Sequence, residues 1–336
     1  MPSRELNLRI RRLGRTDLNV SEFGLGCARI GGIFKRDPAE FVNLLSAAFD
    51  AGINFFDTAD IYSQGESELF LGRAFRGRRR DQVVIASKAG YVLPSRRRFI
   101  ARVKPLVRPV IRLLGLTRRH VAGVVSGSLA QDFSPSHLRR AVEGSLRRLR
   151  TDRLDLFQLH SPSTGIVEAG GWIEALEALK AQGKIRHYGV SCDSVDAALA
   201  ALGHAGVSSV QVAINLLERD AATVLPHAQE QGVGIIAREC LANGLLVKDI
   251  SVLDVSAYTR SEGEATVKAR QIELYRKAAA ENACTLTQLA LQFVSGLEGV
   301  SVSLIGVSSM PQLDALLTNE LPSRARPEPR AIPHFE

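Results

Sequence analysis

The sequence is poor in cysteine, tryptophan and methionine, and it contains no long hydrophobic run. Its 336 residues include 4 Cys, 1 Trp and 2 Met. The cysteines, Cys27, Cys192, Cys240 and Cys284, lie far apart and form no C-x-x-C pair, which argues against a zinc ribbon or a disulfide framework. No apolar stretch approaches the roughly 18 residues that a membrane span needs, so we expect no membrane insertion.

The amino-terminal segment and the charge balance narrow the class of protein further. The opening MPSRELNLRIRRLG has no apolar stretch followed by a small-residue cleavage site, so we expect no secretion signal and a cytoplasmic location. The formal net charge is +8, with much of the excess in Arg-rich patches at 76–80 and 96–119. No nucleic-acid-binding motif accompanies them. We interpret these patches as solvated basic loops that also attract anionic cofactors or substrates, and we expect no nucleic-acid partner.

Short runs rich in Val, Ile and Leu alternate with longer segments whose apolar residues recur at helical spacing. This alternation is typical of βα units and a parallel sheet. After a hairpin predicted over 9–20, strands are predicted at 22–27, 54–57, 83–87, 154–160, 185–191, 209–213, 234–238 and 301–306. Such units close most naturally into a (β/α)8 TIM barrel of the α/β class. We expect a single domain over 1–336 with its core at about 13–317.

Helix signals separate the predicted strands. Asp37-Pro38 and Ser134-Pro135 each offer an N-cap followed by a proline at the first helical position, and Gly52 follows the end of the first helix. The third and seventh predicted strands are followed by segments too long for ordinary connections, at 89–133 and 242–264. Both leave the carboxyl-terminal face of the barrel, where barrel enzymes hold their active sites, so both are candidate substrate and cofactor lids.

Four ionisable residues lie at or just after the ends of consecutive predicted strands. Asp57 ends GINFFD and Tyr62 follows five positions later; Lys88 ends VVIASK, and His160 ends LDLFQLH. Polar residues are poor choices for an otherwise apolar strand unless its end opens into a polar site. Taken singly, each has an ordinary alternative: a helix cap, a packed aromatic or a structural histidine. If the barrel closes, however, all of them converge on one place.

The segments GINFFDTADIYSQGESELFLG, IASK and LDLFQLHSP resemble the signature segments of the aldo-keto reductase superfamily, and the likeness runs over about 13–317. The resemblance implies an oxidoreductase that transfers a hydride between a nicotinamide cofactor and a carbonyl or alcohol substrate. It also implies a catalytic tetrad made of Asp57, Tyr62, Lys88 and His160.

The expected chemistry explains why these residue types are needed. Tyr62 donates the proton in reduction and accepts it in the reverse direction. An unperturbed phenol titrates near pH 10, so we expect the charge of Lys88, held by Asp57, to lower the pKa of Tyr62. His160 hydrogen-bonds the substrate oxygen and, with Tyr62, stabilises its developing negative charge.

The resemblance also implies a cofactor site, with three departures from the family pattern. Ser191 and Gln211 are expected to bind the nicotinamide carboxamide, but Cys192 replaces the family's asparagine. Arg238 replaces an aromatic residue and can stack on the nicotinamide, modestly favouring the reduced form; alternatively it only pairs with Glu239 or another acid. The full set expected to contact the cofactor is Gly26, Ser191, Cys192, Gln211, Arg238, Leu241, Gly244, Gly306, Ser308 and Gln312.

The third departure concerns the choice between NADP(H) and NAD(H). Residues 241–244 are expected to wrap the pyrophosphate, and 304–312 resembles the adenosine-phosphate segment, where backbone N–H groups bind phosphate. Relatives that prefer NADP(H) usually carry Arg or Lys two positions after the glycine of this segment, whereas Ser308 follows Gly306 here. A 2′-phosphate favours a cationic partner, so the NADP(H) preference is weakened. We expect NADP(H) and leave NAD(H) open.

Alternatives of other classes remain. One is a cofactor-binding, redox-sensing regulatory subunit with little turnover, which shares this fold. A metal-dependent barrel hydrolase needs several ligands at strand ends, but His160 is the only strand-end histidine, and we predict no metal. The segment 89–133 holds nine Arg and Lys residues between Arg96 and Arg119. It is either a basic amphipathic lid that selects an anionic or bulky substrate, or a solvated insertion that packs its apolar side on the barrel.

Overall fold

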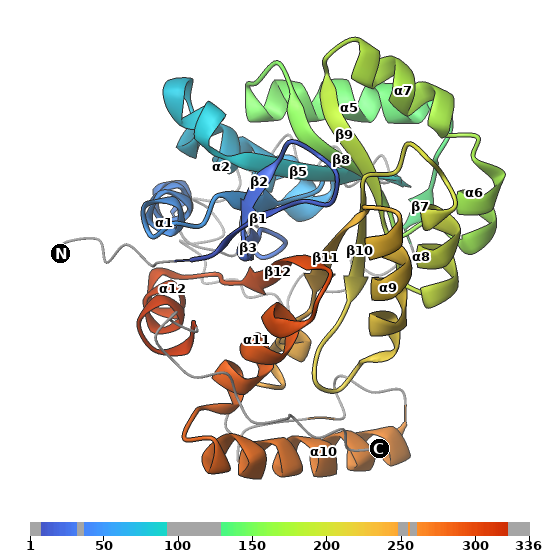
Figure 1. Cartoon of the computed structure of the whole chain (residues 1–336). Coiled ribbons are helices and arrows are strands. Elements are labelled where there is room, and N and C mark those ends of the chain that lie inside the picture. The colour runs from blue at the N-terminus through green and yellow to red at the C-terminus, as the bar shows by residue number, and fades with distance from the viewer. Residues whose placement is uncertain (1–7, 32–36, 93–128, 248–254, 256–260, 322–336) are drawn as a thin grey trace.

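A closed barrel of parallel strands forms the centre of the molecule, surrounded by helices (Figure 1). The computed structural model describes residues 8–31, 37–92, 129–247, 255 and 261–321. The strands follow one another around the barrel in the order β10-β11-β12-β3-β4-β5-β8-β9. Their bounds are β3 (Phe23–Gly26), β4 (Phe55–Asp57), β5 (Val84–Ala89), β8 (Leu154–His160), β9 (Ile185–Ser191), β10 (Ser209–Ala213), β11 (Gly234–Arg238) and β12 (Val300–Gly306). The predicted (β/α)8 barrel is confirmed.

The helices begin where the capping residues predict. The Asp37 side chain accepts a hydrogen bond from the N–H of Ala39, and Ser134 accepts one from the N–H of His137. The α-helices are α1 (Pro38–Asp50), α2 (Glu66–Ala74), α5 (Pro135–Leu149), α6 (Thr164–Ala169), α7 (Ile173–Ala181), α8 (Val195–Leu202), α9 (Leu225–Glu230), α10 (Glu262–Glu281), α11 (Leu286–Gly296) and α12 (Met310–Ala315). Shorter helical turns are η1 (Tyr62–Gly65), η2 (Gly77–Gln82), η4 (Asp220–Val224), η5 (Ala242–Gly244) and η8 (Leu316–Glu320).

Two features differ from the prediction near the third barrel strand. β5 continues to Ala89, beyond the predicted end at residue 87, so Lys88 lies within the strand and pairs in register with Gln158. An unpredicted antiparallel ribbon forms between β6 (Tyr91–Val92) and β7 (Ala130–Gln131), at the two ends of the long segment 89–133. Residues 93–128 of that segment, and residues 248–254 and 256–260 of the loop after β11, lie outside the described residues. The two lid hypotheses therefore stay predictions.

The predicted hairpin, β1 (Ile10–Arg12) and β2 (Asn19–Ser21), covers the amino-terminal end of the barrel. Its residues Leu13 and Leu18 join the buried cluster inside the barrel, which includes Phe55, Leu156 and Ile236. The turn fits closely against β11, because a Cβ on Gly14 would lie 2.4 Å from the nitrogen of Gly234. This end of the barrel is therefore packed shut, and its opposite end is left for chemistry.

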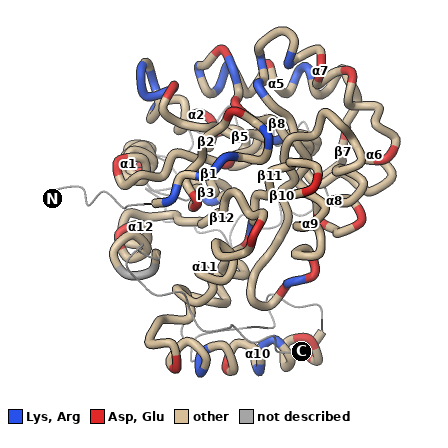
Figure 2. The backbone as a smooth tube through the Cα atoms, in the orientation of Figure 1, with Lys and Arg blue, Asp and Glu red and all other residues tan. Residues whose placement is uncertain are grey.

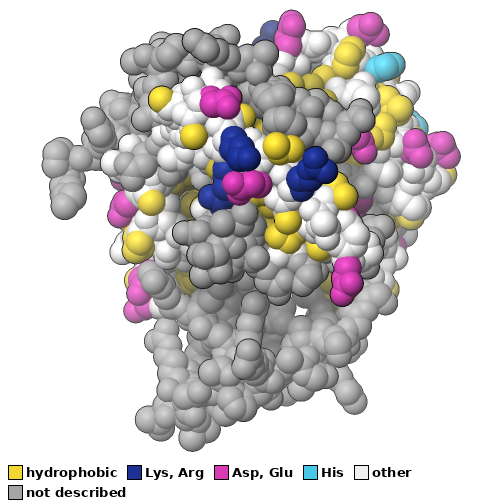
Figure 3. All heavy atoms as spheres, turned by 90° about the horizontal axis from the view of Figure 1, so that it is seen from below, with side chains coloured by type: hydrophobic (Ala, Val, Ile, Leu, Met, Phe, Trp, Pro, Cys, Tyr) yellow, Lys and Arg dark blue, Asp and Glu magenta, His cyan; other side chains and the backbone are white. Residues whose placement is uncertain are grey.

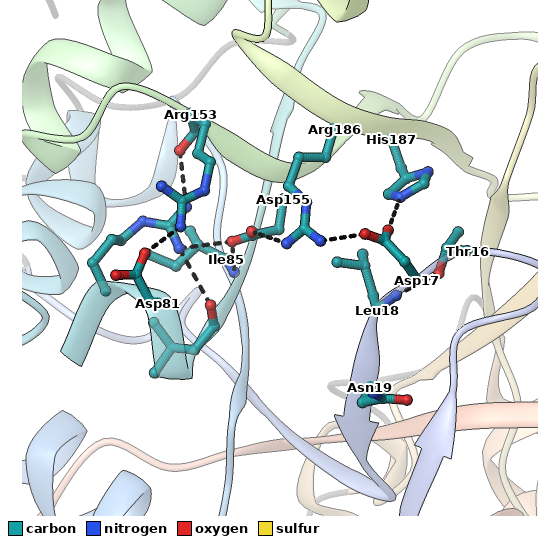
Figure 4. A network of polar contacts seen from close by, with 12 residues as sticks. Thr16, Asp17, Leu18, Asn19, Asp81, Ile85, Arg153, Asp155, Arg186 and His187 are labelled. Atoms are coloured by element: carbon teal, nitrogen blue, oxygen red, sulfur yellow. Dashed lines mark hydrogen bonds and ion pairs between the residues drawn. The ribbon is translucent and has the colours of Figure 1, made fainter. Parts of the chain in front are cut away.

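Beside the hairpin, a network of ion pairs ties the starts of β5, β8 and β9 together (Figure 4). At its centre, the buried Asp155 carboxylate contacts Arg80 at 2.8 Å and Arg186 at 3.0 Å, and it accepts a hydrogen bond from the N–H of Ile85 at 2.9 Å. Arg186 continues to Asp17 of the hairpin at 2.6 Å. The network thus joins the hairpin to three barrel strands through charged groups that are each paired with a group of opposite charge.

Acidic and basic residues are interspersed along the described part of the chain (Figure 2). On the face in Figure 3, basic side chains lie directly beside acidic ones among hydrophobic neighbours. Lys268 of α10, for example, pairs with Glu264 of the same helix and with Glu218, which follows β10. Among the described helices, none combines the length and the apolar character needed to cross a membrane.

Candidate active site

Six of the predicted site residues form two rows across the carboxyl ends of the barrel strands. In one row, Gly306 of β12 pairs in register with Gly26 of β3, which pairs with Asp57 of β4. In the other row, His160 of β8 pairs with Ser191 of β9, which pairs with Gln211 of β10. Residues far apart in the sequence therefore meet at one end of the barrel because neighbouring parallel strands end together.

Asp57 and Lys88 form a buried ion pair at the centre of this end. The Lys88 ammonium lies 2.7 Å and 2.5 Å from the two carboxylate oxygens of Asp57, and it donates to the carbonyl of Thr58 at 3.1 Å. Gln211 donates to the same carboxylate at 2.9 Å. Burial has the largest single effect and lowers the pKa of Lys88, but the charges and hydrogen bonds of Asp57 and Tyr62 together raise it more, so the pKa of the ammonium lies above its ordinary value. Lys88 is therefore a fixed positive charge.

Tyr62 lies beside this cation. It begins the η1 turn, whose residues Ser63, Gln64 and Gly65 all have left-handed backbone angles. The turn is tied down by a hydrogen bond from the Ser63 hydroxyl to the carbonyl of Ile30 at 2.7 Å. The Lys88 nitrogen lies 5.2 Å from the centroid of the Tyr62 ring. This turn carries the phenol back over the end of the strand that holds Asp57.

The prediction that Lys88 leaves Tyr62 with a lowered pKa is wrong in its net direction. Burial raises the pKa of the phenol, and the charge of Lys88 lowers it by less than that. The pKa of Tyr62 therefore lies above its ordinary value. Because burial disfavours the charged phenolate, Tyr62 is protonated at neutral pH, as a proton donor must be.

His160 completes the group, with its ring edge-on to that of Tyr62 at 5.7 Å between centroids. The side chain is buried, and its Nδ1 has no hydrogen-bond partner among the described residues. Burial, together with the charges of Lys88 and Arg238, lowers the pKa of His160 to about 3. The imidazole is therefore neutral at physiological pH and has an unused polar atom inside the site.

The lowered pKa of His160 predicts a pH dependence of stability. The unfolded chain binds a proton at this histidine near pH 6.5, and the folded chain only near pH 3, so stability is lost as pH falls between these values. Between pH 7 and pH 5, the wild type should lose about 2 kcal/mol of unfolding free energy relative to His160→Gln, because that variant has no imidazole to protonate. Urea unfolding of both proteins at the two pH values measures this difference. Parallel losses in the two proteins would contradict a neutral, buried His160.

The residues expected to bind the nicotinamide carboxamide are linked to the ion pair. The Ser191 hydroxyl donates to the amide oxygen of Gln211 at 3.1 Å, and Gln211 in turn donates to Asp57. Cys192 follows Ser191 and is buried. Ser191, Gln211, Asp57 and Lys88 therefore form one hydrogen-bonded chain.

Arg238, at the end of β11, pairs with acids in this structure. Its guanidinium contacts Glu239 and lies 2.7 Å from Asp193, and it donates to the carbonyl of Cys192 at 3.2 Å. This is the alternative stated from the sequence, and stacking on a nicotinamide stays a prediction. The Nε of Arg238 is buried and has no partner among the described residues.

The remaining predicted cofactor residues lie in two turns. In the first, the N–H of Gly244 donates to the carbonyl of Leu241 at 2.9 Å. In the second, the N–H and the hydroxyl of Ser308 both donate to the side-chain oxygen of Gln312, at 2.9 Å and 3.0 Å. Gly306 is open, since a Cβ added there would meet no atom within 4 Å. The second turn thus has space beside Gly306 for a bound group, but Ser308 provides no positive charge for a phosphate.

Cys27, Cys192 and Cys240 are buried and follow β3, β9 and β11, at the carboxyl end of the barrel. Burial raises the pKa of Cys192 and of Cys240 to about 12, so both thiols are protonated and chemically quiet. Within the described ranges, no three His, Cys, Asp or Glu side chains gather in a way that could hold a metal ion.

Three residues of the site were missed from the sequence. Gln158 of β8 is buried and its amide nitrogen lies 3.5 Å from Asp57; a polar residue in the apolar run LDLFQLH was a usable signal. Tyr91 packs edge-on against His160 with 4.8 Å between ring centroids. Gln131 donates to the backbone of His160 and Ser161. The last two are on the unpredicted ribbon, and nothing in their local sequence indicates these contacts.

Comparison with known proteins shows the class of protein that this barrel and site define. The family model described as "Aldo/keto reductase family" matches residues 22–320. The chain belongs to the aldo/keto reductase family, a family of oxidoreductases that act on small carbonyl substrates.

Individual relatives agree with this assignment. Over 311 residues the chain is 30% identical to the uncharacterized oxidoreductase YqkF of Bacillus subtilis (strain 168), covering 91% of this chain and 89% of that protein. Over 238 residues it is 33% identical to D-threo-aldose 1-dehydrogenase of Pseudomonas sp, covering 69% of each protein. The holo form of aldo-keto reductase AKR11C1 from Bacillus halodurans matches with a TM-score of 0.74 at 29% identity, covering 93% of this chain and 90% of that one.

Proposed function

We propose that the protein transfers a hydride between a nicotinamide cofactor and a small carbonyl or alcohol substrate, with Tyr62 as the general acid and base. The observation that carries the proposal is the buried Asp57–Lys88 pair beside the Tyr62 ring and the neutral His160. A phenol next to a fixed cation can donate a proton and remain as a stabilised phenolate. A neutral imidazole can donate a hydrogen bond to the substrate oxygen without competing for the proton.

The roles of the residues follow from their electrostatics. Lys88 lowers the cost of forming the Tyr62 phenolate, and Asp57 holds the ammonium in place through both carboxylate oxygens. Because Tyr62 has a raised pKa, it is ready to donate at neutral pH, whereas its use as a base requires higher pH. These properties favour carbonyl reduction near neutrality and alcohol oxidation in alkaline solution.

The residues around the site fit a nicotinamide cofactor, which supplies or accepts the hydride when bound. Gly26 and Gly306 are adjacent in register, and a Cβ on Gly26 would meet only the carbonyl of Ile305, at 3.5 Å. A cofactor backbone can therefore approach these strand ends closely. Ser191 and Gln211 offer the hydroxyl and amide groups that bind a carboxamide. Ser308 supplies no charge for a 2′-phosphate, so the proposed preference for NADP(H) rests on the family resemblance.

Titration with NADPH and with NADH, followed by turnover of a substrate panel, tests this function. We expect both reduced cofactors to quench protein fluorescence and NADPH to bind more tightly. With the preferred cofactor, the protein should reduce aldehydes, ketones or aldoses; a relative named as an aldose dehydrogenase supports including sugars. Tight cofactor binding without turnover of any of these compounds would instead favour a redox-sensing regulatory role.

A further inference from the structure

The ring of His160 is not oriented by any hydrogen bond among the described residues. Its Nδ1 is buried without a partner, although functional histidines are usually fixed by a hydrogen bond from the second ring nitrogen to a carbonyl or carboxylate. The place of the imidazole in this site must therefore depend on packing and on the backbone that carries it. The β6–β7 ribbon contributes to the packing of the ring and restrains this backbone.

Tyr91 of β6 provides the packing. Its ring meets that of His160 at 82° with 4.8 Å between centroids, closer than the 5.7 Å between His160 and Tyr62. Edge-to-face contacts in this range are favourable and depend on ring orientation. The imidazole thus contacts two aromatic rings edge-on, that of Tyr62 in η1 and that of Tyr91 in β6.

Gln131 of β7 provides the backbone restraint. Its amide nitrogen has two hydrogens, and it donates to the carbonyls of both His160, at 3.3 Å, and Ser161, at 2.8 Å. Ser161 adopts a left-handed backbone with φ 54°, a conformation that a serine rarely takes without support. Gln131 therefore restrains the turn that ends β8 and, with it, the position of His160.

The ribbon is itself fixed to the core of the barrel. Tyr91 and Gln131 are opposite one another in the antiparallel pairing, and the N–H of Asp132 extends it to the carbonyl of Gly90 at 2.7 Å. Gly90 has φ 142°, and a Cβ there would lie 2.2 Å from the ring of the buried Phe133. Only glycine permits this close contact between the residue that precedes β6 and the segment that follows β7. Tyr91 on β6 and Gln131 on β7 are therefore held together as one unit.

We infer that Gln131 and Tyr91 are positioning residues that act through His160. This inference rests on the proposed function of His160. Gln131→Met keeps the side-chain length and removes the donor, and Tyr91→Leu removes the ring, whereas Tyr91→Phe keeps it. With cofactor affinity unchanged, Gln131→Met and Tyr91→Leu should each lower kcat about tenfold, because small displacements of a group that orients the substrate are costly. Tyr91→Phe should keep most of the wild-type kcat.

A double-mutant cycle with His160→Gln separates positioning from a general structural role. If Gln131 acts through His160, Gln131→Met should lower kcat in the wild type and cause no further loss in the His160→Gln background. An equal loss in both backgrounds, or no loss in the wild type, would overturn the inference. If His160→Gln itself left kcat unchanged, the proposed function of His160 would fail. This outcome is distinguishable from a failure of the positioning inference, because it involves no substitution in the ribbon.

Discussion

Tyr62→Phe reduces carbonyl substrates about a thousandfold more slowly than the wild type, since general acid catalysis by a positioned side chain contributes about 10²- to 10⁴-fold. The substitution removes one oxygen and keeps the ring, so the packing beside Lys88 and His160 is retained. Cofactor affinity should therefore change little while kcat falls. Steady-state turnover and a fluorescence titration on the same preparation measure both quantities.

Tyr188→Phe is the matched control for this result. Tyr188 is also buried, but its hydroxyl donates to Glu177 at 2.6 Å, on the outer side of β9 and away from the site. The control should keep wild-type kcat even if it costs some stability. Equal kcat values for wild type and Tyr62→Phe would show that another group donates the proton.

Asp155→Ala should lower the free energy of unfolding by about 3–5 kcal/mol, the usual cost of removing one partner of a buried ion pair. The buried carboxylate serves Arg80, Arg186 and the N–H of Ile85, and all three lose this acceptor together. Asp155 and Arg186 are near the starts of β8 and β9, whereas His160 and Ser191 end these strands, so the network lies at the end of the barrel opposite the candidate active site. The effect should therefore appear in stability and not in the kcat of the folded enzyme.

Urea unfolding at pH 7 measures the effect, with Asp81→Ala as the comparison. Asp81 pairs with Arg153 at 2.5 Å in the same region, but its side chain is 69% exposed, and exposed pairs contribute little. Asp81→Ala should leave the free energy of unfolding nearly unchanged. Similar losses in the two variants would mean that the Asp155 contacts do not hold the strands together.

The barrel could be predicted from the sequence because strands buried on both faces appear as apolar runs between helical segments. Each predicted strand is present: β8, β9, β10 and β11 have the predicted bounds, and the ends of the other four differ by at most two residues, as for β5 beyond residue 87. The convergence of the polar site residues at one end of the barrel could be predicted for a related reason. Asp57, Lys88 and His160 are polar residues at the ends of buried strands, where only a shared polar site makes them favourable.

Properties that arise from packing could not be predicted in the same way. The pKa of Tyr62 depends on how deeply the η1 turn buries the phenol, and burial outweighs the effect of Lys88. The contact between Gln131 and His160 depends on a ribbon whose two strands are separated in the sequence by residues 93–129. By its chemistry Arg238 could stack on a ring or pair with acids. The pairing depends on the folded positions of Asp193 and Glu239, and the stacking stays a prediction.

The most direct test of hydride transfer uses NADPH carrying deuterium at C4 of the nicotinamide, incubated with the wild-type protein and an aldehyde. The account predicts that deuterium appears at the carbinol carbon of the alcohol product, and that Tyr62→Phe forms this product far more slowly. The account would be contradicted if the alcohol product contained no deuterium with the label on either face of the nicotinamide ring. It would also be contradicted if no carbonyl compound of the panel gave a product.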